Sequence, residues 1–490
     1  MVPARPSSAA VGTDLGTSNT VVAHADSASA RALADDVGRD VLLPSVCAFH
    51  PSGAVVVGRE AKARRLQDPK NTIFSAKRLI GRPWGTKEVA QARARLPYDL
   101  RQGKNASVLV AVRGKEYTLP EVSAFILRKA KATAEVALAC SVDRAVVTCP
   151  ANFDDLQRGA TKLAGKLAGL QVLRILNEPT AAALAYGYGK AGEELILVYD
   201  FGGGTFDVSV LVRQGDFFQV RATAGDSYLG GDDIDAAVAN RMAEAFAAKH
   251  FYDPRADSQV FEQVRAAAEE IKVRLAVEER ASLELSDIAF GAGGKTLPFD
   301  FAMTRAELGA IVDPFVERTF RVCRHALEQA AVDVRQVDQI LLVGGSTLVP
   351  RVRERVSELF GREPAAGVSP FEAVAVGAAI QAHAMSEVEE DESGVPSSAA
   401  LAAARKLIDL RPAPSTPSRA PVIEPLPAPA PVAAPVVNVP EALSAPVLSS
   451  GPSRFVIEKA PSEAPAPRAR TWIFVAAAAA LALLAWLVLR

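Results

Sequence analysis

The sequence has 490 residues, 49% of them hydrophobic, with 55 basic and 56 acidic side chains. This length allows two to four domains, and the apolar content is sufficient for a large buried core. The near-zero net charge and the lack of a recognisable RNA- or DNA-binding module argue against nucleic acid as a partner. The four cysteines include no CxxC pair and the five histidines are scattered, so no metal cluster is indicated.

The N-terminal residues MVPARPSSAA lack the apolar stretch of a secretory signal peptide. From about residue 11 to 385, apolar runs typical of buried strands alternate with helical patterns. We expect strands at 145–150, 195–201 and 339–345, and helices at 121–138, 261–275 and 352–360. This alternation predicts an α/β domain, which we place at residues 9–385.

Two stretches of this region interrupt a β-rich run with glycines that follow an aspartate. The first is VGTDLGTSNTVVAHA at 11–25, and the second is VYDFGGGTFDVSVL at 198–211. Their similarity predicts two similar halves. A third turn, LLVGGSTLVP at 341–350, also breaks an apolar strand with glycines and hydroxyl residues.

Glycine turns of this kind suit the binding of phosphate. They expose backbone N–H groups to phosphate oxygens, and threonine and serine add hydroxyl donors. An aspartate at a strand end can hold Mg²⁺ directly or through water. Ordinary hairpins are the alternative, but two matching turns and a third glycine turn favour a site that holds a triphosphate from both sides.

The motifs DLGTSN, FSAKRLIGR, LNEPTAAALAYG, DFGGGTFDVSVL, GDSYLGGDDID and LLVGGST occur here in the order found in Hsp70 chaperones. Residues 11–385 resemble the nucleotide-binding domain of that family. The resemblance implies an actin-like α/β fold, with two lobes and duplicated sheets around a central nucleotide cleft. It implies ATP or ADP and Mg²⁺ as ligands. AKRLIGR and NEPTAAALAYG distinguish the chain from actins and sugar kinases, which share the fold.

The resemblance also implies roles for individual residues. Asp14 and Asp200 are expected to position Mg²⁺ through water. Lys77 would reach the γ-phosphate and the attacking water, which Glu178 and Asp207 would orient. The expected catalytic residues are Lys77, Glu178, Thr205 and Asp207. The expected nucleotide-binding residues are Gly16, Thr17, Ser18, Asn19, Gly202, Gly203, Gly204, Thr205, Gly230, Gly231, Glu269, Lys272, Gly344, Gly345 and Ser346.

The sequence departs from the family pattern where the base would bind. Leu348 stands where the family has an arginine that stacks on adenine, and Ala276 stands where it has a serine near the base. Phe371 replaces the aspartate of the family's NPDEAVA segment. These changes remove polar contacts to the base and leave the phosphate-binding residues intact. We therefore predict weaker ATP binding than is usual in the family.

Three further residues match positions that communicate with partners in the family. Pro150 and Arg158, in CPANFDDLQR, resemble a proline switch and its arginine, and Arg174 resembles an arginine that contacts J-domain proteins. Alternatively, the two arginines are ordinary surface charges. FGAGGKT at 290–296 resembles a P-loop, but the first required glycine is Ala289 and a predicted strand follows, so we expect a hairpin turn there.

The chain changes character after residue 385. An acidic stretch, SEVEEDE, is followed by a segment, 412–467, with 15 prolines. So many prolines exclude regular helix or sheet, and we predict a disordered spacer at 386–471. A short helix is expected at 398–408. KLIDLRP at 406–412 resembles the apolar linker of Hsp70 proteins, although a chance match explains it more simply.

Residues 472–489, WIFVAAAAALALLAWLVL, contain no charge. A helix of this length would measure ~27 Å, about the thickness of a bilayer hydrocarbon core, so we expect a single C-terminal transmembrane helix. Arg468 and Arg470 on its N-terminal side favour a cytoplasmic location for the first domain. The composition suggests a bacterial inner membrane.

No pattern of a peptide-binding β-sandwich or helical lid follows the first domain, so peptide clamping is not expected of this sequence. The favoured hypothesis is a membrane-tethered ATPase that couples nucleotide state to an unidentified partner or client. The resemblance implies a J-domain protein and a nucleotide exchange factor as partners. One alternative is a nucleotide-sensing recruitment switch with little turnover, which the altered base side favours slightly. Another is an actin-like filament protein, against which Lys77 and the NEPT motif argue.

Overall fold

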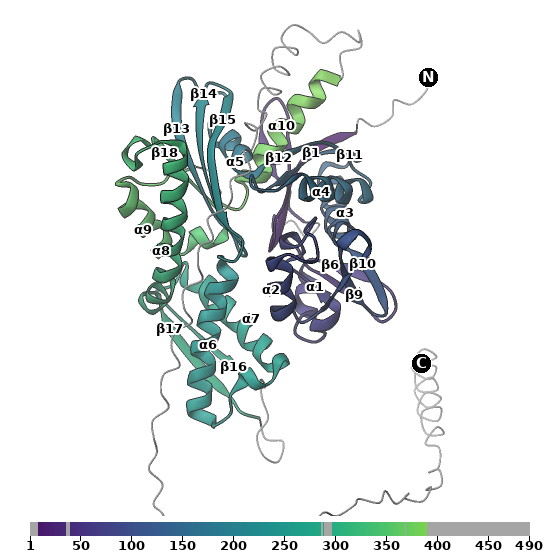
Figure 1. Cartoon of the computed structure of the whole chain (residues 1–490), viewed down its shortest axis with the longest axis vertical. Coiled ribbons are helices and arrows are strands. Elements are labelled where there is room, and N and C mark those ends of the chain that lie inside the picture. Colours follow the sequence, from purple (N-terminus) through teal and green to yellow (C-terminus); the bar gives the residue numbers. More distant parts are fainter. Residues whose placement is uncertain (1–7, 36–39, 286–287, 289–295, 368, 390–490) are drawn as a thin grey trace, which may run out of the picture. The chain divides into compact units, whose positions relative to one another are not determined.

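The computed structural model describes residues 8–35, 40–285, 288, 296–367 and 369–389. The chain divides into two compact units, Met1–Thr416 and Pro417–Arg490, and every described residue belongs to the first. This unit contains two central β-sheets with helices packed against them, which confirms the predicted α/β class (Figure 1). We name the part around the first sheet lobe I and the part around the second sheet lobe II.

Lobe I is built on a sheet with strand order β12-β11-β1-β2-β3, in which β4 also pairs with β2. Its strands are β1 (Ala9–Leu15), β2 (Asn19–Ala25), β3 (Ala30–Ala32), β4 (Leu43–Pro44), β11 (Val142–Cys149) and β12 (Gln171–Asn177). Its helices are α3 (Leu119–Leu138), α4 (Asp155–Leu167), α5 (Glu178–Gly187) and α10 (Ala373–Glu389).

The outer part of lobe I carries two small sheets, of orders β6-β5-β7 and β10-β9-β8. These strands are β5 (Cys47–Phe49), β6 (Val55–Val57), β7 (Thr72–Ile73), β8 (Asp99–Gln102), β9 (Val108–Val112) and β10 (Lys115–Thr118). The same region includes α1 (Arg59–Arg64), the short 3₁₀ helix η2 (Ala76–Arg78) and α2 (Lys87–Arg95).

Lobe II is built on a sheet of order β15-β14-β13-β18, with the hairpin β16–β17 farther out. Its strands are β13 (Glu193–Phe201), β14 (Phe206–Gln214), β15 (Phe217–Asp226), β16 (Arg280–Leu285), β17 (Phe299–Thr304) and β18 (Gln339–Val343). Its helices are α6 (Gly231–His250), α7 (Ser258–Leu275), α8 (Arg305–Ala330), the 3₁₀ helix η7 (Gly345–Leu348) and α9 (Pro350–Phe360).

The two central sheets repeat one arrangement. In each, an antiparallel hairpin, β1–β2 or β13–β14, lies beside a strand parallel to its first strand, β11 or β18. Asp14 is the second-last residue of β1, and Asp200 is the second-last residue of β13. The prediction of two similar halves is therefore confirmed, and the two aspartates occupy equivalent places in them.

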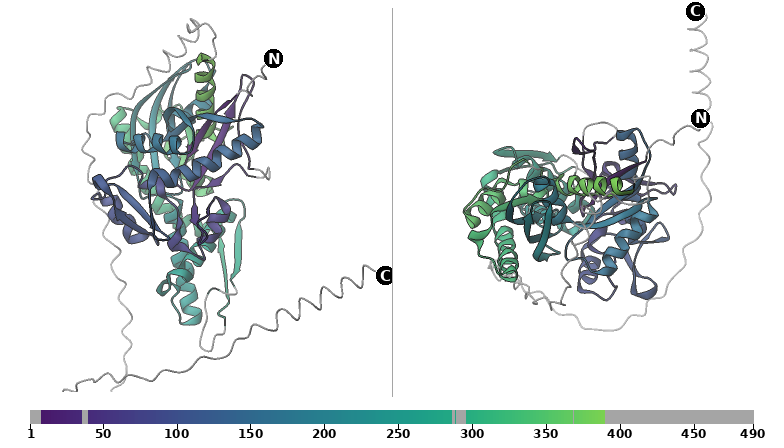
Figure 2. Two further views of the ribbon diagram at one scale, coloured as in Figure 1. Left: turned by 90° about the vertical axis from the view of Figure 1, so that its right-hand side faces the viewer. Right: turned by 90° about the horizontal axis from the view of Figure 1, so that it is seen from above.

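Helix α10 returns late in the sequence to pack against β1 and against α5 (Figure 2). Two glycines permit this close approach. A Cβ at Gly12 of β1 would lie 2.0 Å from the Ala379 backbone nitrogen, and a Cβ at Gly377 would lie 1.7 Å from the Ala181 carbonyl oxygen. Helix α10 thus joins the sheet of lobe I to α5, the helix that begins with Glu178.

Local sequence signals explain where the predicted helices begin. In α3, Thr118 and Glu121 form a reciprocal capping box, and Asp257 accepts hydrogen bonds from the first turn of α7. These caps start α3 and α7 earlier than the hydrophobic pattern indicated. Helix α9 begins at Pro350, where a missing N–H costs nothing because first-turn N–H groups have no intrahelical acceptor.

Several predictions fall outside the described residues. They are the spacer beyond Glu389, the short helix at 398–408, the linker-like 406–412, the apolar run at 472–489, and the P-loop-like turn apart from Thr296. Strands β16 and β17, which flank that turn, pair antiparallel. Within the described part of the chain, no helix is both long and apolar enough to span a bilayer. Helix α10 continues to Glu389, past the predicted start of the spacer.

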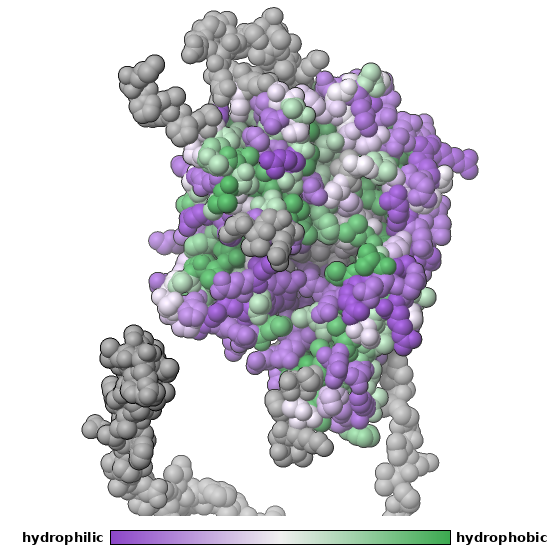
Figure 3. Space-filling view, turned by 180° about the vertical axis from the view of Figure 1, so that it is seen from behind, coloured by the Kyte–Doolittle hydropathy of each residue, from purple (hydrophilic) through white to green (hydrophobic). Residues whose placement is uncertain are grey.

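Each lobe has a hydrophobic core of its own. Tyr199, Phe201 and Phe206 stack edge to face in lobe II, and lobe I buries a separate cluster around Leu127. On the face seen in Figure 3, hydrophobic residues lie in separate patches among hydrophilic ones. A third buried cluster joins the lobes, with Val146 of the first sheet, Val198 and Leu341 of the second, and alanines of α5 and α10. Polar groups and glycines make further contacts between the lobes, described next.

Candidate functional site

The two glycine hairpins meet, one from each lobe. A Cβ on Gly203 would lie 2.1 Å from the Ser18 hydroxyl oxygen, and a Cβ on Gly204 would lie 2.8 Å from the Thr17 methyl carbon. No side chain larger than hydrogen fits at Gly203 or Gly204 without moving the opposite hairpin. The structure thus brings the two predicted phosphate-binding turns together, with the glycines of the second facing the side chains of the first.

Hydrogen bonds from a neighbouring segment of the same lobe hold each hairpin in place. In lobe I, the backbone N–H of Ser45 donates to the Ser18 carbonyl (2.8 Å), and its hydroxyl donates to the Gly16 carbonyl (2.9 Å). In lobe II, the Gly231 N–H donates to the Gly202 carbonyl (3.0 Å), and the Ser346 hydroxyl donates to the same oxygen (2.8 Å). Both turns are therefore held in place by hydrogen bonds from neighbouring segments of the protein.

The start of α6 lies directly against the second hairpin. The Asp232 N–H donates to the Gly203 carbonyl (2.7 Å), and a Cβ on Gly230 would lie 2.4 Å from that oxygen. Gly230 and Gly231 therefore belong to the same backbone cluster as Gly202 and Gly203. Asn19, the first residue of β2, completes the predicted set in lobe I.

The predicted catalytic residues converge beside the hairpins. Lys77 of η2 forms an ion pair with Glu178 of α5 (Nζ–Oε1 2.5 Å), and their side chains are only 10% and 8% exposed. Thr148, at the end of β11, donates its hydroxyl proton to Asp14 (2.8 Å). Asp207 is the second residue of β14 and lies directly opposite Asp200 across the hairpin.

Asp207 has two further partners. The Thr205 hydroxyl hydrogen-bonds to its carboxylate, and the Asn152 amide nitrogen donates to Oδ1 (3.1 Å). Asn152 lies in lobe I, so this second bond joins the lobes at a predicted catalytic carboxylate.

Burial and mutual repulsion disfavour the ionised carboxylates. Burial raises the pKa of Glu178 to about 7 and of Asp207 to about 6. Burial also raises the pKa of Asp14, and burial together with the charges of Glu178, Asp207 and Asp14 raises that of Asp200 well above its usual value. Burial opposes the charge on Lys77, but Glu178, Asp14 and Asp200 outweigh it, so the pKa of Lys77 is raised.

Four carboxylates with one lysine form a site that attracts additional positive charge. Among the described residues, no three His, Cys, Asp or Glu side chains are close enough together to bind a metal ion directly. This arrangement fits Mg²⁺, which favours oxygen ligands and retains much of its water shell. Asp14 and Asp200, at equivalent strand ends, would hold such an ion through its waters.

The third glycine turn follows β18. Gly344 has φ +85°, and a Cβ there would lie 2.4 Å from the Phe201 carbonyl oxygen, so this position requires glycine. A Cβ on Gly345 would lie 2.7 Å from the Phe371 ring. Leu348, at the end of this turn, is 41% exposed. The structure therefore places Phe371 against the turn and leaves Leu348 accessible.

The two predicted ribose contacts already have charged partners. Glu269 pairs with Lys62 of lobe I (2.6 Å), and Lys272 pairs with Asp235 of α6 (2.8 Å). Lys272 also donates to the Gly231 carbonyl (3.3 Å), which places it beside the phosphate hairpins. Glu269 thus bridges the lobes in this structure.

A second set of contacts between the lobes surrounds Tyr228, which we name the Tyr228 clasp. The Tyr228 hydroxyl donates to the Glu88 carbonyl of α2 (2.6 Å), and the guanidinium groups of Arg78 and Arg95 each lie 5.4 Å from its ring. Arg78 also pairs with Asp232 of α6 (3.3 Å). A Cβ on Gly204 would lie 2.5 Å from the Arg78 guanidinium, so the clasp directly underlies the second hairpin.

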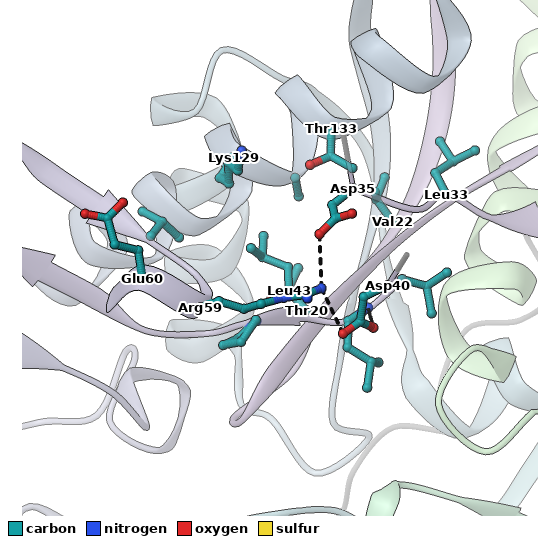
Figure 4. A pocket seen from close by; sticks show the side chains of 15 residues that line it. Thr20, Val22, Leu33, Asp35, Asp40, Leu43, Arg59, Glu60, Lys129 and Thr133 are labelled. Atoms are coloured by element: carbon teal, nitrogen blue, oxygen red, sulfur yellow. Dashed lines mark hydrogen bonds and ion pairs between the residues drawn. The ribbon is translucent and has the colours of Figure 1, made fainter. Parts of the chain in front are cut away.

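Two cavities lie close to the site but are not lined by its aspartates. One, of about 230 Å³, is in lobe I, where Arg59 pairs with Asp35 and Asp40 (Figure 4). It reaches Thr20, next to the first hairpin. The other, of about 340 Å³, lies beside the Tyr228 clasp and is lined from both lobes.

The residues of the proposed proline switch lie in and beside the loop between β11 and α4. Arg158 of α4 donates to the carbonyls of Ala151 (3.1 Å) and Phe153 (2.9 Å), so it holds this loop and is not merely a surface charge. Arg174 lies on β12, where partial burial lowers its pKa. Its expected contact with a J-domain protein stays a prediction.

Sequence reasoning did not single out Thr148, Asn152, Ser45 or Tyr228. Thr148 lies two residues before the end of the predicted strand AVVTCP, and a polar residue near the carboxyl end of a buried strand was an available signal. Ser45, Asn152 and Tyr228 act across loops or between lobes, and no local pattern marks such contacts.

Comparison with known proteins agrees with this geometry. A family model described as Hsp70 protein matches residues 10–394. Chaperone protein DnaK of Thermus thermophilus is 45% identical to this chain over 374 residues, which cover 76% of the chain and 60% of that protein. The chain therefore spans about 60% of the length of this curated relative. A match of this extent shows that the chain belongs to the Hsp70 family.

Proposed function

We propose that this chain is a membrane-tethered ATPase of the Hsp70 family that couples its nucleotide state to a partner protein. Hsp70 proteins are ATPases that bind ATP or ADP with Mg²⁺. The observation that carries the proposal is the convergence of Lys77, Glu178, Asp14, Asp200 and Asp207 beside two backbone hairpins, one from each lobe.

This arrangement suits phosphoryl transfer, in which catalysis is mostly positioning and charge neutralisation. The exposed backbone of the hairpins at Gly16 and Gly203 would hold the phosphates. Lys77 would neutralise charge on the γ-phosphate, and Glu178 and Asp207 would orient the attacking water. Asp14 and Asp200 would hold Mg²⁺, which would neutralise negative charge on the phosphates when bound.

The decisive experiment measures ATP turnover by the full chain in detergent, beside Lys77→Ala and Lys162→Ala. We expect steady turnover in the parent and in Lys162→Ala, and at least ~100-fold slower turnover in Lys77→Ala with nucleotide binding retained. Lys162→Ala controls for the loss of a lysine, because it removes an exposed lysine of α4. Mg-ATP binding without turnover in the parent would reject the ATPase and favour a nucleotide-controlled recruitment switch.

One observation favours the second function, a nucleotide-controlled recruitment switch. Leu348 and Phe371 give the base end of the site apolar residues at positions where the family resemblance implies polar ones. A protein that senses nucleotide without hydrolysing it needs contacts to the phosphates but does not need rapid turnover. Measured binding and turnover together separate the two functions.

The membrane tether rests on residues 472–489 and the proline-rich spacer before them. We propose that this segment anchors the chain by a single span in the bacterial inner membrane, with the ATPase domain in the cytoplasm. Carbonate extraction should leave the full chain in the membrane and release a chain that stops at Thr471. Protease added to spheroplasts should spare the ATPase domain, and cleavage of that domain would contradict the proposed orientation.

The proposed partners follow from the sequence similarity to DnaK proteins, which work with J-domain proteins and nucleotide exchange factors. We propose one protein of each kind as partners of this chain, with Arg174 at the J-domain contact. Turnover stimulated by a J-domain protein and lost in Arg174→Ala would support this pairing. The client is not identified by the sequence, and the proposed cycle requires only a partner that distinguishes the two nucleotide states.

A further inference from the structure

The loop after β11, at 150–154, reaches from lobe I to the second phosphate hairpin. At its tip the Asn152 side-chain amide donates a hydrogen bond to Asp207 Oδ1 (3.1 Å). We propose that Asn152 is a positioning residue that fixes the Asp207 carboxylate when the lobes close around nucleotide. The proposal rests on the proposed ATPase function and assigns a role to a residue to which the family resemblance gave none.

Arg158 holds the loop on both sides of Asn152. Its guanidinium group donates to the Ala151 carbonyl (3.1 Å) and to the Phe153 carbonyl (2.9 Å), and it contacts the Cys149 sulfur (3.3 Å). A planar guanidinium with five donors can hold three acceptors in a fixed geometry. The residues before and after Asn152 therefore have little freedom to move.

The start of α4 fixes the other end of the loop. Asp154 accepts a hydrogen bond from the Gln157 backbone (2.9 Å), and the Gln157 side chain accepts one from the Asp154 backbone (3.3 Å). Gln157 is itself buried. This capping box ties the loop to a helix that packs on the sheet of lobe I.

In lobe II, a glycine leaves space for the contact between Asn152 and Asp207. Gly225 of β15 lies directly opposite Asp207 of β14. A Cβ on Gly225 would lie 2.3 Å from Asp207 Oδ1 and 3.0 Å from the Asn152 amide nitrogen. The glycine therefore leaves room for both partners, and the contact is accommodated from both lobes.

The chemistry assigns Asn152 to positioning and not to proton transfer. A side-chain amide does not titrate, and its N–H can hold one carboxylate oxygen while the Thr205 hydroxyl holds the carboxylate as well. Two donors would leave Asp207 one preferred orientation toward the attacking water. A misplaced catalytic group can lower the rate ~10–100-fold while the substrate still binds.

The first test compares Asn152→Ala and Asn152→Asp in the full chain. We expect Asn152→Ala to lower kcat about 10-fold with KM for ATP changed less than about 2-fold. Asn152→Asp should lower kcat further because it places a carboxylate against Asp207. Asn240→Ala removes the same side chain from an exposed position on α6 and should behave as the parent. Parent-like turnover in Asn152→Ala would overturn the proposal.

A double-mutant cycle then identifies the group through which Asn152 acts. In an Asp207→Ala background, Asn152→Ala should cause no further loss of turnover, because the two residues act as one unit. An equal loss in both backgrounds would show that Asn152 acts elsewhere and would reject the proposal. The Tm should stay close to that of the parent, since Asn152 is exposed.

Hydrogen exchange in Mg-ATP tests the contact without any need for turnover. We expect faster exchange in Asn152→Ala at the 149–153 loop and at the 203–208 hairpin, and no change in Asn240→Ala. Unchanged exchange at both segments would reject the interlobe contact. If the parent binds ATP without hydrolysing it while the exchange effect is present, the ATPase proposal fails and the contact between Asn152 and Asp207 stands.

Discussion

At the proposed phosphate end of the site, Lys77 pairs with Glu178, Asp14 accepts a hydrogen bond from Thr148, and Asp207 accepts hydrogen bonds from Thr205 and Asn152. At the proposed base end, Leu348 is exposed and Phe371 packs against Gly345. The charged residues of the first end thus hold one another in place, and the second end presents apolar side chains.

This difference has an energetic consequence. Preorganised charges contribute most where charge develops during a reaction, because no reorganisation is then required. Contacts to the base stabilise bound substrate and transition state equally, and such uniform binding changes KM more than kcat. We therefore expect substitutions at the phosphate end to act on turnover, and substitutions at the base end to act on affinity.

The largest expected effect is at the strand-end aspartates. Asp14→Asn or Asp200→Asn should lower kcat by about 100-fold or more, because each removes a charge expected to hold Mg²⁺. The measurement is steady-state turnover at saturating Mg-ATP. Asp155→Asn removes an exposed aspartate of α4 and serves as the control. Equal turnover in Asp200→Asn and the control would remove Asp200 from the metal site.

A pH experiment tests the buried charge of the phosphate end in the protein without nucleotide. Burial raises the pKa of Glu178 to about 7, from an ordinary value of 4.5. Between these values the native state keeps a proton that the unfolded state releases, so the stability from this group is full below about pH 4 and is lost as the pH rises through 7. The loss should be about 1–3 kcal/mol.

The readout is the thermal midpoint at pH 5 and pH 8 in parent and Glu178→Gln, without Mg²⁺. The parent should lose more stability than the variant between these two pH values. Mg-ADP should then stabilise the parent more at pH 8, where the carboxylates are ionised. A parallel pH dependence in both proteins would show that Glu178 is not the group responsible.

The base end should respond through affinity. Leu348→Arg supplies a guanidinium where the family resemblance implies one, and stacking of an arginine on an aromatic base contributes about 0.5–1 kcal/mol at an exposed site. We therefore expect ATP affinity to rise about 2–5-fold with kcat nearly unchanged. Leu163→Arg, on the exposed face of α4, adds the same charge away from the site.

Titration calorimetry gives both affinities. A nanomolar dissociation constant in the parent would contradict the prediction of weak base binding. An equal gain in Leu163→Arg would assign the effect to overall charge and not to the base.

A further effect is expected at the Tyr228 clasp, in the rate of ADP release. Tyr228→Phe keeps the ring between Arg78 and Arg95 but removes the hydrogen bond to the Glu88 carbonyl. A bond of this kind contributes about 0.5–1.5 kcal/mol net, so ADP release should quicken about 2–10-fold. Stopped-flow release of a fluorescent ADP measures this, with Tyr188→Phe, an exposed tyrosine, as the control. An unchanged release rate would show that the clasp does not limit opening of the lobes.

The sequence alone determined the α/β class and the two similar halves. These features are local: an aspartate before a glycine turn, a strand of buried apolar residues, a capped helix. The repeated aspartate and glycine turn predicted a phosphate site, and the family resemblance then supplied the roles expected of Asp14 and Asp200. The motif around Lys77 was recognised by resemblance, and its pairing with Glu178 was not.

Only the tertiary structure decided which residues from distant segments share one site. Asn152 meets Asp207, Lys62 meets Glu269, and Tyr228 meets Glu88 because the lobes pack in one orientation. Their sequence separations are large, and no period or spacing along a chain encodes a contact between separately folded lobes. The pKa of Glu178 depends likewise on burial and on Lys77, which come into being only when α5 and η2 pack together.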